Sequence, residues 1–149
     1  MKRLAVLLLA AAPIAAGAAT FRVDDSATLP NEANTAMQWR SLAPNRVAGN
    51  AVDGTSVFTV RLNTSPWLNK AGRIYMALAE QPIGTVTAEW STQGRLLPGT
   101  LVSGNRTLVY SGPIRTPLLE DTIALRISAD GRRLVSPQRL QFYFEIDVD

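Results

Sequence analysis

Two residue types, cysteine and histidine, are absent from the 149-residue chain. Their absence excludes disulfides, thiolate nucleophiles, zinc sites of the Cys/His type and catalytic centres that use histidine as a base. Ser65 and Lys70 stand too far apart in sequence for a Ser-Lys pair with S-x-x-K spacing. We therefore expect no catalytic residues, no bound metal and no cofactor, and we expect that the protein is not an enzyme.

The chain also lacks a large excess of charge of either sign. Fifteen basic and 12 acidic residues give a net charge of +3. Lys2 and Arg3 lie in an N-terminal segment that we expect to be removed, which would leave a net charge of +1. The remaining basic residues are almost all arginine and are scattered along the sequence. Because nucleic-acid binding needs a clustered basic face, we expect no nucleic-acid partner.

The first 18 residues have the three parts of a secretory signal peptide. Lys2 and Arg3 form a positive start, Leu4 to Ala12 form an apolar run, and Ala16-Gly17-Ala18 fits the cleavage pattern. The run is shorter than the roughly 18–20 apolar residues that span a bilayer, and no later segment is more apolar, so we expect no transmembrane segment. The sequence predicts a signal peptide over 1–18, one domain over 19–149, and bacterial export to the periplasm or cell surface.

Apolar and polar residues alternate with period two, and no segment of useful length has the periodicity of a helix. The alternation is clearest in 58–62, 74–78, 86–90, 123–127 and 140–148. Burial on one side only is typical of antiparallel sheets. Turn signals separate these segments at a spacing of roughly ten residues. The pattern predicts an all-β, immunoglobulin-like antiparallel sandwich of two sheets with about eight or nine strands, and a small β-barrel is the alternative.

Two Asp-Gly pairs are strong turn signals in this pattern. Asp53-Gly54 is expected to precede a strand that includes Val57. Asp130-Gly131 follows the 123–127 segment and predicts a type I′ hairpin, in which both central residues have positive φ.

Three carboxylates, those of Glu145, Asp147 and Asp149, recur at every second residue of the last segment. On a strand they would lie on one face, about 7 Å apart. This spacing is too wide for one calcium ion without ligands from a loop. We expect instead ion pairs with outward arginines such as Arg61 or Arg126, or protection of an exposed sheet edge by charge.

The three tryptophans have different expected roles. Trp90 is in register with apolar neighbours and is predicted to lie in the core, as is Trp39. Trp67 follows Pro66 on a connection between strands. On a loop it could contact a sugar or a partner, or it could close the open end of a sandwich.

The expected export, fold and lack of catalytic groups favour a structural or interaction protein of the envelope or cell surface. In size, export signal and strand number the chain is similar to bacterial fimbrial subunits, although it lacks the cysteine pair that many of them carry. The resemblance implies sheet-edge contacts with envelope proteins or with further copies of the chain. Residues 19–29 would then donate a strand, with Phe21 and Val23 as anchors and Trp67 as a further partner contact. An ordinary first strand is the simpler interpretation of the same residues.

A periplasmic small-ligand or glycan-binding module is the alternative function. Trp67, Tyr75 and Tyr110, with nearby arginines, are its candidate contacts. A pocket with convergent polar groups would support this function.

Overall fold

A computed structural model of the chain describes residues 17–30, 37–40, 49–134 and 136–149. Within these ranges, ten strands and one short 3-10 helix make up the secondary structure, and eight of the strands have four residues or more. The elements are β1 (Ala19–Arg22), β2 (Leu29–Pro30), β3 (Gln38–Trp39), β4 (Ala51–Asn63), η1 (Ser65–Trp67), β5 (Ala71–Leu78), β6 (Thr87–Thr92), β7 (Gly99–Val102), β8 (Arg106–Pro113), β9 (Leu118–Asp130) and β10 (Phe142–Val148).

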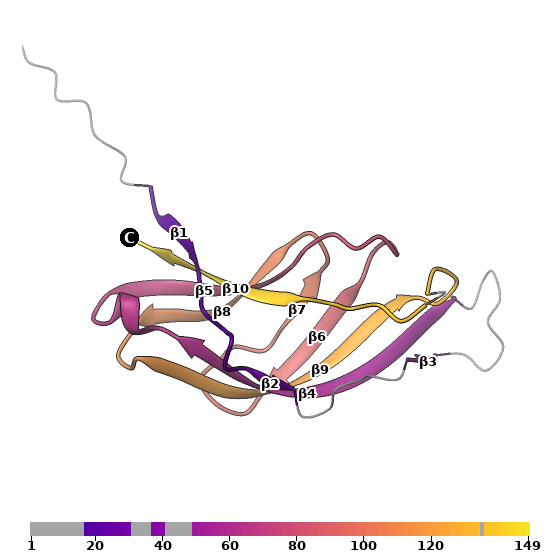
Figure 1. The fold of residues 1–149 in the computed structure, drawn as a ribbon, viewed down its shortest axis with the longest axis horizontal. Helices are drawn as coiled ribbons and strands as arrows, with labels where there is room; N and C mark the ends of the chain where they lie inside the picture. Colours follow the sequence, from indigo (N-terminus) through magenta and orange to yellow (C-terminus); the bar gives the residue numbers. More distant parts are fainter. Residues whose placement is uncertain (1–16, 31–36, 41–48, 135) are drawn as a thin grey trace, which may run out of the picture.

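The strands form two separate antiparallel sheets that pack face to face (Figure 1). One sheet has four strands in the order β1-β10-β5-β8. The other has the order β2-β4-β9-β6-β7, and β3 also pairs with β4. This arrangement confirms the predicted two-sheet sandwich and differs from a single closed sheet.

One hydrophobic core lies between the sheets, and the alternating residues supply it. Every second residue of a strand points to the same face, so each strand contributes one side to the core. The buried sets include Val60 and Leu62 on β4, Ile74, Met76 and Leu78 on β5, Ala88 and Trp90 on β6, Ile123, Leu125 and Ile127 on β9, and Phe144, Ile146 and Val148 on β10. The core position predicted for Trp90 is confirmed, whereas the side chain of Trp39 lies outside the described residues.

The turn predicted at Asp53-Gly54 is wrong, because both residues lie inside the long strand β4. The Asp53 carboxylate faces outward and accepts hydrogen bonds from Arg40, Arg126 and the Ser128 hydroxyl, each with a contact of 2.7 Å. These bonds, first those from Arg40, hold the pKa of Asp53 well below its ordinary range, although partial burial acts in the opposite direction. Charged hydrogen bonds across neighbouring strands thus outweigh the weak strand preference of Asp and Gly.

The hairpin predicted at Asp130-Gly131 is also wrong. β9 ends at Asp130, and the next strand, β10, belongs to the other sheet. Neither residue of the pair has the positive φ that a type I′ turn needs. The Gly131 amide instead donates to the carbonyl oxygen of Asn50 at 2.7 Å, and Arg132 pairs with Asp130.

In the part of the chain that the structure describes, no helix is long and apolar enough to span a membrane. The expected signal peptide lies almost wholly outside this part, since description begins at residue 17.

Replacing Trp90 with alanine should strongly destabilise the sandwich. The side chain is 4% exposed, and its indole N–H donates to the carbonyl oxygen of Leu97 at 3.0 Å. We expect the free energy of unfolding to fall by about 3–5 kcal/mol, because a large cavity opens and the Leu97 carbonyl loses its partner. Urea denaturation of Trp90→Ala, with Trp90→Phe as the smaller-change control, measures this. A loss below about 1 kcal/mol for the alanine variant would contradict the core position.

Candidate functional site

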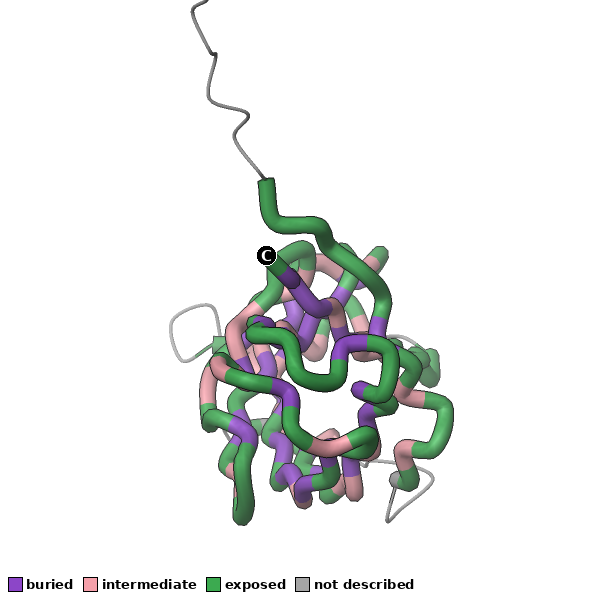
Figure 2. Tube along the Cα trace, turned by 90° about the vertical axis from the view of Figure 1, so that its left-hand side faces the viewer, coloured by how far each residue is buried: buried purple, intermediate pink, exposed green. Residues whose placement is uncertain are grey.

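The N-terminal strand β1 lies at the edge of the four-stranded sheet. It runs antiparallel to β10, with Ala19 opposite Val148 and Arg22 opposite Glu145. All four of its residues are exposed, and the first described stretch of chain is green throughout in Figure 2. Among the described strands, none pairs with the outer side of β1. The two ends of the described chain therefore lie side by side at one end of the sandwich (Figure 1).

Few side chains hold β1 against the rest of the molecule. The Thr20 hydroxyl donates to Asp147 Oδ1 at 2.6 Å. The Arg22 guanidinium lies 4.2 Å from the centre of the Tyr143 ring, a cation–π contact. The ring centres of Phe21 and Trp67 are 6.1 Å apart.

The next residue, Val23, enters the core. It is 1% exposed, and its amide donates to the carbonyl oxygen of Phe144 at 2.9 Å. One residue later the chain reaches the other sheet, where the Asn63 amide donates to the carbonyl oxygen of Asp24 at 2.9 Å. Val23 is thus the last residue of the N-terminal segment that pairs with the four-stranded sheet before the chain crosses to the other sheet.

The structure brings two of the three predicted partner residues together and buries the third. Phe21 is 46% exposed and contacts Trp67. Trp67 is 9% exposed and belongs to the core, so it closes an end of the sandwich. Val23 has almost no surface available while β1 stays in its own sheet.

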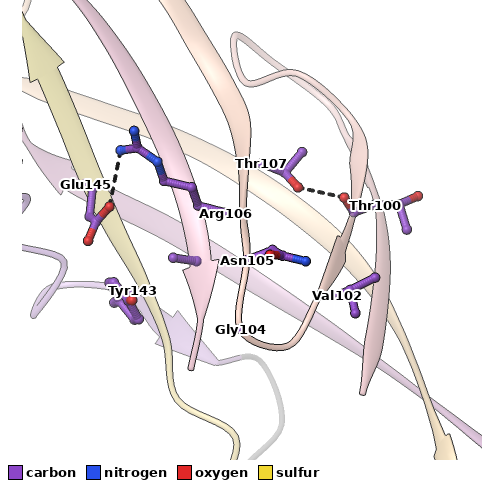
Figure 3. Close-up of a pocket in the computed structure, with 9 residues that line it drawn as sticks. Thr100, Val102, Gly104, Asn105, Arg106, Thr107, Tyr143 and Glu145 are labelled. Carbon is purple, nitrogen blue, oxygen red and sulfur yellow. Dashed lines mark hydrogen bonds and ion pairs between the residues drawn. The ribbon is translucent and has the colours of Figure 1, made fainter. Parts of the chain in front are cut away.

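The alternating carboxylates of the last strand form ion pairs on the outer face of the four-stranded sheet. Arg106 on β8 reaches across β5 to β10, as Figure 3 shows. Its guanidinium lies 3.0 Å from Asp147 Oδ2 and 3.3 Å from Glu145 Oε2. It also lies 4.1 Å from the centre of the Tyr75 ring. Arg73 completes the row by pairing with Asp149 at 3.5 Å.

The predicted ion pairing is therefore correct in kind, but its predicted partners are wrong. Arg61 pairs with Glu120, and Arg126 pairs with Asp53. Both arginines belong to the other sheet, whereas β10 lies between β1 and β5. The alternative interpretation, in which these charges protect an exposed sheet edge, is wrong because β10 is an inner strand.

Asp147 is the most enclosed carboxylate of this row, with a side chain that is 10% exposed. The Arg106 guanidinium and then the Thr20 hydroxyl lower the pKa of Asp147, while partial burial acts to raise it. Within the described ranges, no group of three or more His, Cys, Asp or Glu residues is placed to hold a metal ion.

A hollow of about 570 Å³ lies beside these ion pairs (Figure 3). Tyr143, Ala77 and Arg106 are opposite one another across β10, β5 and β8. Because the alanine between the two large side chains is small, a hollow remains between them, and the turn that joins β7 to β8 forms its other side. Its remaining lining residues are Thr100, Val102, Gly104, Asn105, Thr107 and Glu145.

The contacts predicted for a ligand-binding module do not share this hollow. Arg106 covers Tyr75, and Trp67 lies in the core. Tyr110 lines a separate hollow of about 400 Å³ with Arg95 and Arg115. The outward position of Tyr143 in the last strand was readable from the sequence, but its place opposite Ala77 was not.

Comparison of the chain with protein-family models, with curated proteins and with solved structures finds no match in any of the three. The chemistry of the described residues must therefore indicate function. At this end of the molecule they provide an exposed edge strand and a polar hollow on the adjacent sheet face.

Replacing Arg106 with methionine should destabilise the protein at neutral pH and much less in acid. Asp147 would keep its charge in an enclosed site without the guanidinium that pairs with it, and we expect a loss of about 2 kcal/mol at pH 7. Because its folded-state pKa is lowered, the carboxylate stabilises the fold above its ordinary pKa and loses this contribution as pH falls.

Urea unfolding at neutral pH and at pH about 3 measures the difference between wild type and Arg106→Met. Arg61→Met is the control, because its partner Glu120 is 48% exposed and the loss should stay below about 0.5 kcal/mol. An Arg106→Met loss of equal size at both pH values would show that the ion pair with Asp147 is not its cause.

Proposed function

We propose that the chain is an exported, non-enzymatic protein of the bacterial envelope or surface. In this proposal it is a structural or assembly subunit of fimbrial type that exchanges β1 with a neighbouring copy. The observation that carries the proposal is the position of β1, an edge strand exposed at every residue. β1 also begins at Ala19, directly after the expected cleavage site, so export would leave it with a free N-terminus.

The contacts of β1 are of a kind that a second copy can supply without change. They run from β1 to β10 and to Trp67, and none of them depends on which chain the strand comes from. Exchange of an identical element is an established route to assembly at little cost in free energy, and an unpaired sheet edge accepts an added strand.

β1 is also held by far fewer backbone pairs than the long strands β4 and β9 are. β4 and β9 pair along all 13 residues of each, whereas β1 contributes four. Val23 adds one buried side chain, which stabilises the docked strand by about 1.5–3 kcal/mol. Local opening of β1 therefore requires much less free energy than opening of the body of the sandwich.

The exchanging unit ends at Val23. From Asp24 onward the chain is attached to β4, through Asn63 and through the Arg61 amide, which donates to the Thr28 hydroxyl at 3.0 Å. The chain crosses from one sheet to the other between Val23 and Asp24, and this crossing would be the hinge for strand exchange. A donor segment that reached to Leu29 would have to break these contacts as well.

The expected export can be tested on the chain itself. Protein produced in a bacterium with residues 1–149 should be recovered from the periplasm or the medium with Ala19 as its first residue, as N-terminal sequencing would show. Ala18→Arg should block cleavage and leave the full-length mass, because the cleavage site requires a small residue. Cytoplasmic accumulation of uncleaved wild-type protein would contradict the proposal.

Strand exchange can be tested with engineered cysteines, because the chain has none of its own. Arg22 and Glu145 lie opposite each other on β1 and β10, within the range that a disulfide can join. Two differently tagged copies, Arg22→Cys and Glu145→Cys, would be co-expressed in an oxidising periplasm. We expect a covalent heterodimer, and a ladder of covalent oligomers when one chain carries both substitutions.

The pair Arg61→Cys and Glu120→Cys is the control, since these residues are also opposite one another but join β4 to β9. It should give no heterodimer, and in one chain it should give only an internal disulfide. If Arg22→Cys and Glu145→Cys behave in the same way as this control, β1 stays in its own sheet and the proposal fails.

A further inference from the structure

The hollow over Ala77 contains no residue of β1, so the proposed strand exchange does not involve its lining. Ala77 lies beneath the hollow and is only 2% exposed, since Tyr143 and Arg106 flank it on the neighbouring strands. From the chemistry of the lining we infer that the hollow binds a neutral sugar ring of a glycan. The inference does not depend on strand exchange, because the lining residues all come from β5, β7, β8, β10 and the turn between β7 and β8.

The lining has unused hydrogen-bonding groups around an aromatic side chain. In the described part of the chain, no intramolecular hydrogen bond is made by the side-chain amide of Asn105 or by the hydroxyl of Tyr143. Together they offer both donors and acceptors, as the Glu145 carboxylate offers acceptors. Sugar hydroxyls need both kinds of partner, and the C–H side of a pyranose packs on an aromatic surface.

The charges at the hollow cancel one another, and this selects for a neutral ligand. Arg106 is shared between Glu145 and Asp147, and Arg22 lies over Tyr143. An anionic ligand would be repelled by Glu145, and a cationic ligand would be repelled by Arg106. A neutral polyol meets neither penalty.

The hollow is shallow and open, so the affinity should be modest. A ligand that keeps most of its surface in water gains little from burial, and a Kd on the order of millimolar is expected. Repeated copies in an assembled structure would raise the effective affinity through multivalency. A weak site of this kind is suited to a surface protein that is present in many copies.

The test is an ¹⁵N NMR titration of residues 19–149 with maltotriose, cellotriose, mannotriose and fully N-acetylated chitotriose as neutral probes and trigalacturonate as the acidic probe. We expect saturable shifts from at least one neutral probe, centred on Ala77, Asn105 and Tyr143. Ala77→Leu should weaken binding at least about tenfold by filling the hollow. Ala124→Leu is the matched control, because Ala124 is an exposed residue on the outer face of β9.

Asn105→Ala is the second variant, and it removes hydrogen-bonding groups without adding volume next to Arg106. It should also weaken binding, while the amide resonances of β5 and β10 stay in their wild-type positions. The inference is overturned if no neutral probe gives saturable shifts, if Ala77→Leu and Asn105→Ala bind as wild type does, or if trigalacturonate binds at these residues more tightly than the neutral probes. Each of these results leaves strand exchange untouched, since the cysteine experiment reports on β1 alone.

Discussion

The pairing of β1 with β10 is the contact on which the rest of this end of the molecule depends. β10 is an inner strand only because β1 covers its outer edge from Glu145 to Val148. Its inward residues supply the core, and its outward carboxylates are held by Arg106 from one side and by Thr20 from the other. If β1 left, β10 would expose backbone groups that a second strand of the same sequence could satisfy.

Both proposals meet at β10, but they use different sides of it. Strand exchange uses the backbone edge that β1 covers. Sugar binding uses the outer face, where Tyr143 and Glu145 border the hollow. Arg22 connects the two, because it belongs to β1 and lies over the Tyr143 ring. If a neighbouring copy supplied β1, its Arg22 would therefore pack on Tyr143 and restrict the movement of that lining side chain.

Local sequence pattern was sufficient for the strands and their inward faces, because side-chain alternation is a property of each strand alone. It failed where distant residues decide the local structure. Asp53-Gly54 is extended because Arg126 and Ser128, far away in the sequence, bind the aspartate. Asp130-Gly131 makes no hairpin because the chain crosses to the other sheet after β9. The alternation of side chains also carries no information about the order of strands in a sheet. Arg106 could therefore not be predicted as the partner of Asp147, and the hollow beside Ala77 could not be predicted either.

The most direct measurement of the central claim is hydrogen–deuterium exchange of the protein over residues 19–149 at low and high concentration. If β1 is a detachable strand, the amides of 19–23 should exchange far faster in dilute solution than those of the β5–β10 ladder, and they should become protected as the protein assembles. If the amides of 19–23 exchange only as slowly as the β5–β10 ladder at every concentration, β1 opens only with the whole fold, and the claim is contradicted.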